Sequence, residues 1–331
     1  MDSNNVYTQV QDHYGSLARA EKPSYSGAIA QAFGYTEEEL SSIPRDANLG
    51  LSCGNPLAIA SLREGETVID LGSGAGFDIF LAAKKVGSKG RAIGVDMNKD
   101  MLARAHDNHV KSGGAENVSF VEGRITSIPI EDSIADCIIS NCVINLVPEA
   151  EKPAVFTEMA RLLKPGGRVA ISDILARKPF PTELRESVAA YVGCVAGCAP
   201  KEDYERLLTE NGFRDIVIVD TESDLNVYID MAYEGKQENE DVAGCCGSLA
   251  IGAATGTVRE TPCCSEKVAN CCSKTSSKAR DSKHAGSIST PEVAGVSCFS
   301  ELRSKTHSSV AASWIFADID INEWAGKFLY L

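Results

Sequence analysis

The stretch Val68-Ile69-Asp70-Leu71-Gly72-Ser73-Gly74-Ala75-Gly76 decides the fold of this chain. Its apolar first half predicts a buried strand, and three glycines at alternate positions follow directly. Glycines there allow a tight strand-to-helix turn and let backbone N–H groups approach a bound ligand. A second predicted strand ends in Asp96, about 20 residues after the loop, where a carboxylate can hold ribose hydroxyls. The pattern indicates a cofactor such as NAD, FAD or S-adenosylmethionine (SAM), with candidate binding residues Asp70, Gly72, Ser73, Gly74, Gly76 and Asp96.

Residues 65–176 alternate between apolar strand candidates and helical segments. Strands are expected at Thr67–Leu71, Arg91–Asp96, Val118–Glu122, Asp136–Ser140 and Arg168–Ile174. Helices are expected at Phe77–Lys85, Asp100–Ser112 and Pro153–Leu163. Because strands that alternate with helices form a parallel sheet covered on both faces, the sequence predicts an α/β fold with a doubly wound, mainly parallel sheet.

Four further segments flank this core. Residues 1–64 predict an N-terminal cap with short helices, and residues 177–236 predict a helical cap over 178–212 followed by a late strand at Phe213–Asp220. Residues 237–312 are rich in Ser, Gly, Lys and Thr, so we expect a flexible stretch that buries little apolar surface. Residues 313–331 are apolar and aromatic again, and we expect them to return to the sheet as a final strand. The Cys-rich stretch would then be an insertion.

Composition limits the partners and the compartment. The net charge of −14 disfavours a nucleic-acid partner, because an acidic protein repels phosphates. The N-terminus shows no signal-peptide pattern and no apolar run is long enough to cross a bilayer, so we expect a cytoplasmic protein without membrane contact. Twelve cysteines then favour thiolate chemistry or soft-metal binding over disulfides. Cys137, inside an apolar run, is instead expected to be a small buried hydrophobe.

One segment narrows the choice of cofactor. Leu162-Leu163-Lys164-Pro165-Gly166-Gly167-Arg168-Val169 resembles the helix, turn and strand that precede the fifth strand of class I SAM-dependent methyltransferases. The resemblance covers roughly residues 65–220 and implies a Rossmann-like fold with SAM as cofactor. Asn141 ends the fourth predicted strand at the edge where ligands bind. Met97, Ile125 and Asn141 are therefore added to the candidate cofactor-binding residues.

Three cysteine motifs resemble those of arsenite methyltransferases within that superfamily. They are Gly50-Leu51-Ser52-Cys53-Gly54-Asn55-Pro56, Ser140-Asn141-Cys142-Val143-Ile144-Asn145-Leu146 and Gly193-Cys194-Val195-Ala196-Gly197. The ending Asp320-Ile321-Asn322-Glu323-Trp324-Ala325-Gly326 also resembles C-termini of that group. The resemblance implies methylation of arsenite to mono- and dimethylated arsenicals for detoxification. It implies arsenite and methylarsenite as substrates, glutathione or thioredoxin as reductant, and Cys53, Cys142 and Cys194 as the catalytic arsenic ligands.

The chemistry of these cysteines agrees with the resemblance. Trivalent arsenic is soft and thiophilic, and the core cysteines show none of the short C-x-x-C spacing typical of zinc sites. Cys53, Cys142 and Cys194 come from separate segments that only the fold can gather, above the carboxyl edge of the sheet. Two alternatives stay open: the three are unrelated core cysteines, or Cys198, four residues after Cys194, is the third ligand.

The remaining thiols mark a departure from the family pattern. Many members have a fourth cysteine upstream of the first motif that helps to reset the site by disulfide exchange, and residues 1–52 contain none. Three adjacent pairs in the Cys-rich stretch either compensate for it or form a mobile trap that delivers As(III); alternatively, they are exposed cysteines without a role. The pairs are Cys245-Cys246, Cys263-Cys264 and Cys271-Cys272, with Cys298 nearby.

A lone pair on thiolate-bound arsenic needs no general base, so His13, His106 and His109 receive no catalytic role. Tyr14-Gly15 resembles a family element near the methionine end of the cofactor. Two rival functions are a SAM-dependent methyltransferase for a quinone- or sterol-like substrate and a non-catalytic thiol-rich protein that sequesters metalloids. The first would not need the three thiols. The intact glycine loop and Asp96 argue against the second.

Overall fold

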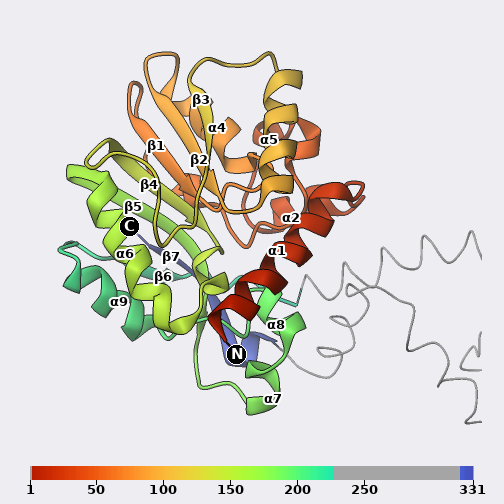
Figure 1. The fold of residues 1–331 in the computed structure, drawn as a ribbon, viewed down its shortest axis with the longest axis vertical. Helices are drawn as coiled ribbons and strands as arrows, with labels where there is room; N and C mark the ends of the chain where they lie inside the picture. Colours follow the sequence, from red (N-terminus) through yellow and green to blue (C-terminus); the bar gives the residue numbers. More distant parts are fainter. Residues whose placement is uncertain (1, 227–320, 331) are drawn as a thin grey trace, which may run out of the picture. The chain divides into compact units, whose positions relative to one another are not determined.

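A seven-stranded sheet forms the centre of the fold (Figure 1). The computed structural model describes residues 2–226 and 321–330, so the Cys-rich stretch and its three cysteine pairs lie outside the described residues. The strand order is β3-β2-β1-β4-β5-β7-β6. Neighbours from β3 to β5 pair in parallel, whereas β7 is antiparallel to both β5 and β6. This arrangement confirms the predicted mainly parallel, Rossmann-like α/β fold.

The parallel strands lie where the sequence predicts them. The observed bounds are β1 Thr67–Leu71, β2 Arg91–Asp96, β3 Val118–Glu122, β4 Ala135–Asn141 and β5 Leu163–Ala176. β5 begins five residues before the predicted Arg168. Between β4 and β5 the register shifts: Ala135 pairs with Leu163 and Cys137 with Arg168, so the predicted Pro-Gly-Gly turn lies inside β5.

Helices cover both faces of the sheet, and their bounds are α4 Phe77–Val86, α5 Lys99–Lys111 and α6 Lys152–Leu162. The alternation of side chains along β1 separates the two faces. Val68 packs in one cluster with residues of α4, whereas Ile69 and Leu71 pack in another with α6 and with α9, Lys201–Glu210. Because both faces of β1 are buried from Val68 onward, its sequence there is apolar apart from Asp70.

The N-terminal cap contains one long helix. α1 spans Ser3–Arg19, and α2 (Ser26–Ala32) and α3 (Glu37–Ser41) follow it. The expectation of short helices only is wrong for α1, because Gly15 lies inside the helix and does not end it. A Cβ at Gly15 would lie 2.9 Å from the Asp100 carboxylate of α5, so glycine allows the two helices to pack closely. None of the described helices is both long and apolar enough to span a membrane.

The segment after β5 is more broken than predicted. The expected helical stretch over 178–212 consists of α7 (Thr182–Arg185), α8 (Val188–Val192) and α9, with a turn around Cys194 between the last two. β6 spans only Ile218–Asp220, within the longer strand predicted there. α12 (Ile321–Trp324) leads into β7 (Ala325–Tyr330), which lies between β5 and β6.

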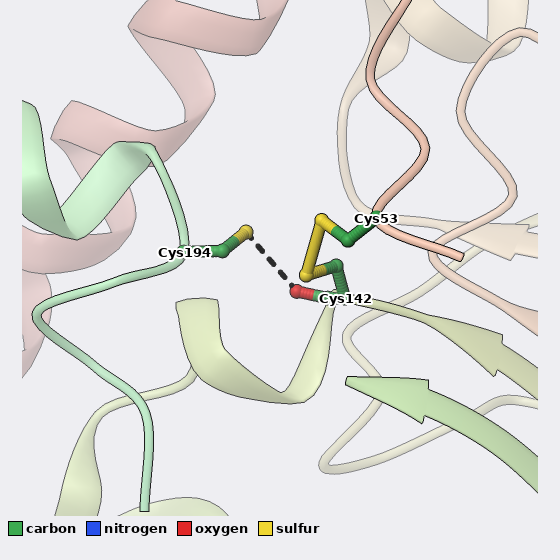
Figure 2. Close-up of side chains that lie close together, drawn as sticks. All are labelled: Cys53, Cys142 and Cys194. Carbon is green, nitrogen blue, oxygen red and sulfur yellow. Dashed lines mark hydrogen bonds between the residues drawn. A yellow bond between two sulfur atoms is a disulfide. The ribbon is translucent and has the colours of Figure 1, made fainter. Parts of the chain in front are cut away.

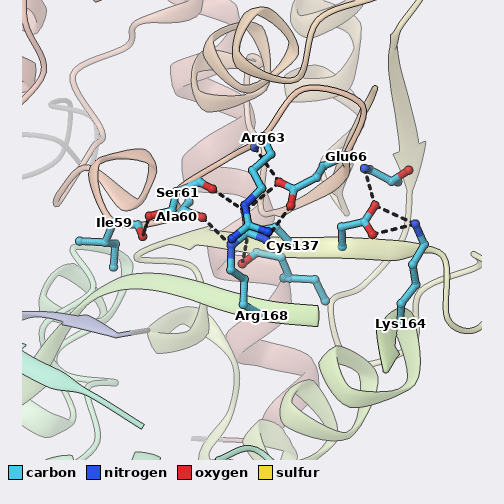
Figure 3. A network of polar contacts seen from close by, with 11 residues as sticks. Ile59, Ala60, Ser61, Arg63, Glu66, Cys137, Lys164 and Arg168 are labelled. Carbon is cyan, nitrogen blue, oxygen red and sulfur yellow. Dashed lines mark hydrogen bonds and ion pairs between the residues drawn. The ribbon is translucent and has the colours of Figure 1, made fainter. Parts of the chain in front are cut away.

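An arginine network fastens the chain that enters β1 to the sheet (Figure 3). Arg168 of β5 donates to the carbonyl oxygens of Ala60 and Ser61 and forms two hydrogen bonds, of 2.9 and 2.8 Å, with Glu66. Cys137 lies beside this network and is fully buried, and burial raises the pKa of its thiol to about 12. These contacts fix the entry into β1 and so the position of the glycine loop that follows it.

Candidate active site

A pocket lies at the carboxyl edge of the sheet, where β1 has β2 on one side and β4 on the other. The crevice at such a switch point is where doubly wound sheets bind ligands. Tyr7, Val10 and Tyr14 of α1 line the same pocket. It joins the glycine loop to two of the three predicted cysteines, Cys142 and Cys194.

The glycine loop lines this pocket with backbone that side chains would obstruct. Gly72 has φ +73°, and a Cβ there would lie 2.5 Å from Cγ2 of Val143. Within the described chain, no hydrogen-bond partner reaches the buried Oγ of Ser73. Gly76 is not among the lining residues: a Cβ on it would lie 2.7 Å from the Phe80 ring, so this glycine serves the packing of α4.

Buried and half-buried carboxylates surround the loop. Asp96, at the end of β2, accepts hydrogen bonds from the backbone N–H of Gly74 at 2.9 Å and of Asn98 at 2.8 Å. Asp70 is 2% exposed, and burial together with the charges of Asp78 and Asp96 raises the pKa of Asp70 well above its usual range. The remaining cofactor candidates, Met97, Ile125 and Asn141, line the pocket as well. A cluster of this kind favours a cationic ligand group, because a positive charge stabilises the ionised carboxylates.

The three predicted cysteines meet beside the pocket (Figure 2). The sulfur atoms of Cys53, Cys142 and Cys194 all lie within 4.8 Å of one another, and all three residues are buried. Cys53 and Cys142 form a disulfide with a Cα–Cα distance of 5.9 Å, and Sγ of Cys194 donates a hydrogen bond to the carbonyl oxygen of Cys142 at 3.2 Å.

The disulfide corrects one expectation. The sequence favours thiolates over disulfides, whereas the structure holds Cys53 and Cys142 in the oxidised form. The sequence does not show this, because 88 residues separate the two cysteines and only the fold brings their sulfur atoms together. Three soft ligands are available at this site only after the bond is reduced.

Backbone conformation sets the positions of two cysteines. Cys142 and Cys194 both have φ +63°, a left-handed conformation that residues other than glycine rarely adopt. Such residues cost about 1–3 kcal/mol and are concentrated at functional sites. Cys142 takes this conformation directly after β4 ends, and Cys194 takes it in the turn after α8.

The surroundings of Cys194 keep its thiol neutral. Burial and the nearby charge of Asp173 raise the pKa of Cys194 to about 12, and the Tyr14 hydroxyl, 3.7 Å from Sγ, opposes this shift. Cys198 does not belong to the sulfur cluster: its Sγ donates to the carbonyl oxygen of Val195 at 2.8 Å. The turn between α8 and α9 is not helical, so Cys194 and Cys198 do not share a helix face. Of the two, the geometry brings Cys194 to the other sulfur atoms.

Comparison with known proteins shows what this chain is similar to. A methyltransferase domain family matches residues 62–212. An arsenite methyltransferase of Halobacterium salinarum is 46% identical over 189 residues, which are 57% of this chain and 48% of that protein. One of Aquipseudomonas alcaligenes is 36% identical over 225 residues, covering 65% of this chain and 64% of that protein.

The chain is similar to arsenite methyltransferases over the residues that these two comparisons cover. A solved structure, an arsenic(III) S-adenosylmethionine methyltransferase from Chlamydomonas reinhardtii, is 33% identical, covers 65% of this chain and 71% of that chain, and has a TM-score of 0.47. The chain spans about half to two thirds of the length of these two curated relatives.

Several residues at this site were not predicted from the sequence. Asp78, in the first turn of α4, is 5% exposed and lines the pocket. Arg124 lies 4.2 Å above the Tyr7 ring, and both line the pocket. The three histidines are absent from the lining: His106 and His109 pack against the Phe120 ring, and His13 packs against Tyr14.

Proposed function

We propose that this chain methylates trivalent arsenic with SAM, holding the arsenic on Cys53, Cys142 and Cys194. The observation that carries the proposal is the meeting of three sulfur atoms within 4.8 Å, beside the pocket that contains the glycine loop. The relatives named arsenite methyltransferase support the same activity.

The pocket residues fit SAM. Ser73 offers a buried hydroxyl without a partner among the described residues, and Asp96 offers carboxylate oxygens. Gly72, where a Cβ would clash with Val143, lets the loop backbone line the pocket. Asp70 and Asp96 suit a cationic cofactor. When bound, SAM would supply an electrophilic methyl group that the lone pair of arsenic can attack, with S-adenosylhomocysteine as the leaving group.

The chain's own residues bind the substrate by exchange. Arsenous acid is neutral, and burial keeps the Cys194 thiol neutral too. Each As–S bond forms as an As–O and an S–H bond break, and one water leaves, so three thiols release three waters. The Cys53–Cys142 disulfide must first take up two electrons and two protons, and we propose glutathione or thioredoxin as their source.

The proposal extends to mono- and dimethylated products, a role in detoxification and methylarsenite as second substrate. It also includes a cytoplasmic location without nucleic-acid or membrane contact, and the delivery of As(III) by the Cys-rich stretch, which lies outside the described residues. A quinone-like substrate would leave the sulfur cluster unexplained. A purely sequestering protein would leave the cofactor pocket unexplained.

The test is methyl transfer itself. The reduced chain is incubated with SAM, arsenite and glutathione, and arsenic species are separated and quantified. We expect methylated arsenic from the wild type and a loss of about a hundredfold or more for Cys142→Ser, since a hard hydroxyl replaces a soft ligand. Cys137→Ser is the matched control for loss of a buried thiol outside the cluster. A wild type that binds SAM and arsenite yet forms no methylated arsenic would overturn the proposal.

A further inference from the structure

Two asparagines of one segment hold the backbone of two distant cysteines. Asn141, the last residue of β4, accepts the N–H of Cys53 at 3.1 Å and donates from Nδ2 to the carbonyl oxygen of Gly54 at 2.8 Å. Asn145, four residues later and fully buried, donates to the carbonyl oxygens of Ile174 at 2.7 Å and of Cys194 at 3.3 Å. Cys142 lies between the two asparagines in sequence.

We propose that Asn141 and Asn145 are positioning residues that each hold one cysteine next to Cys142, an inference that rests on the proposed arsenic site. Cys53 and Cys194 lie in segments outside helices and strands, so no ladder of backbone hydrogen bonds fixes them. Side-chain amides can replace such a ladder, because each carries both a donor and an acceptor. The segment that contributes Cys142 thus also positions Cys53 and Cys194.

Buried neighbours fix which way the Asn141 amide faces. One hydrogen of its Nδ2 serves Gly54, and the other faces Oδ2 of Asp78 at 3.0 Å and the Tyr35 hydroxyl at 3.1 Å; that hydroxyl donates to Oδ1 of Asp78 at 2.6 Å. Asp78 and Tyr35 are 5% and 2% exposed. A flipped amide would point Nδ2 at the N–H of Cys53 and its oxygen at the Asp78 carboxylate. The Tyr35–Asp78 pair therefore holds the amide in the orientation that fits Cys53 and Gly54.

Close packing supports the Asn145 side. The Tyr204 hydroxyl, which donates to Oδ2 of Asp173 at 2.5 Å, lies 3.5 Å from Oδ1 of Asn145. A Cβ at Gly197 would lie 2.0 Å from the Asn145 carbonyl oxygen, so only glycine permits this close approach. The buried Lys152 donates to the carbonyl oxygen of Gly197. The Cys194 turn is thus held at Cys194 by Asn145 and three residues later by Lys152.

The two amides matter for arsenic because a third ligand helps only when it is already close. Once two thiols have replaced two hydroxyls of arsenous acid, the third exchange is intramolecular and depends on the effective concentration of the remaining thiol. If Asn145 no longer holds Cys194, we expect arsenic to stay on Cys53 and Cys142. If Asn141 no longer holds Cys53, we expect it to stay on Cys142 and Cys194.

The experiment follows each cysteine separately in the reduced full-length chain without SAM. Arsenite is added over a range of concentrations, free thiols are alkylated, and peptide mass spectrometry gives the concentration that half-protects each cysteine. We expect Asn145→Ala to raise that concentration about tenfold or more for Cys194, but less than about threefold for Cys53. Asn141→Ala should give the reverse pattern.

Two further variants keep the test decisive. Ser140→Ala is the matched control, because the buried Ser140 hydroxyl has no hydrogen-bond partner among the described residues, and all three cysteines should keep wild-type values. Tyr35→Phe keeps the ring but removes the hydroxyl beside Asn141, so it should shift Cys53 in the same direction as Asn141→Ala by a smaller factor. Tyr35→Phe therefore tests the role of Asn141 even if the Asn141→Ala variant does not fold.

The outcomes separate the two proposals. Equal shifts at Cys53 and Cys194 in every variant, or no shift at all, would overturn the positioning role and leave the arsenic site standing. A wild type in which arsenite protects none of the three cysteines would overturn the arsenic site. The positioning role is then judged by alkylation rates without arsenite, where each variant should accelerate its own cysteine and a uniform change would refute it.

Discussion

Replacing Asp96 by Asn should weaken SAM binding while the fold survives. The two carboxylate oxygens of Asp96 accept from the N–H of Gly74 at 2.9 Å and of Asn98 at 2.8 Å. An amide has only one oxygen, so in either orientation its NH₂ group faces one of these N–H donors. One buried donor then loses its partner, and any ligand hydroxyl loses a charged acceptor.

The size of the effect follows from these contacts. Loss of a hydrogen bond to a charged group costs about 1–3 kcal/mol, which is roughly a 5- to 150-fold increase in Kd. Calorimetric titration of SAM into the reduced chain measures it, and a thermal melt checks that the variant is folded. Asp100→Asn is the control, because Asp100 forms a surface ion pair with Arg19 and does not line the pocket. An Asp96→Asn chain that binds SAM as tightly as the wild type would refute the placement of the cofactor at this loop.

Three further predictions concern the thiols and one buried acid. Cys194→Ser should abolish most methylation of arsenite but leave SAM affinity within about twofold, as calorimetry and product analysis would show. Replacing the paired cysteines of the Cys-rich stretch by Ser should lower the rate at scarce arsenite and not at saturation; equal rates over the whole range would exclude delivery. Burial raises the pKa of Asp173 from 3.8 to about 7, so its contribution to stability is full below about pH 4 and is lost as the pH rises through 7. The wild type should lose about 3 kcal/mol between pH 5 and pH 8 from this group in urea unfolding, and Asp173→Asn should lose clearly less.

The alternating core could be predicted from the sequence because its signals are local. β1, β2 and β3 have the predicted bounds, since each is a short apolar run ended by a polar or glycine residue. The glycine loop and Asp96 are likewise readable, because a parallel sheet brings the carboxyl ends of neighbouring strands to one edge. The sequence predicted secondary structure less well where tertiary contacts override the local preference of the chain for helix or turn. Gly15 lies inside α1 because α5 needs the space, and the turn at Cys194 interrupts the stretch expected to be helical.

The site, like the fold, has features that could be predicted from local sequence and features that depend on tertiary contacts. The sequence by itself predicted soft-ligand chemistry and singled out the three cysteines that meet in the structure, since residue type and local motif carry that information. Only the tertiary structure decided that Cys194 and not Cys198 approaches the other two, that Cys53 and Cys142 are joined, and that Gly76 serves packing. The role of Asn141 also changes: beyond lining the pocket, it holds the backbone of Cys53, 88 residues earlier. Contacts between residues this far apart depend on chain geometry summed over the whole fold, and no local pattern records them.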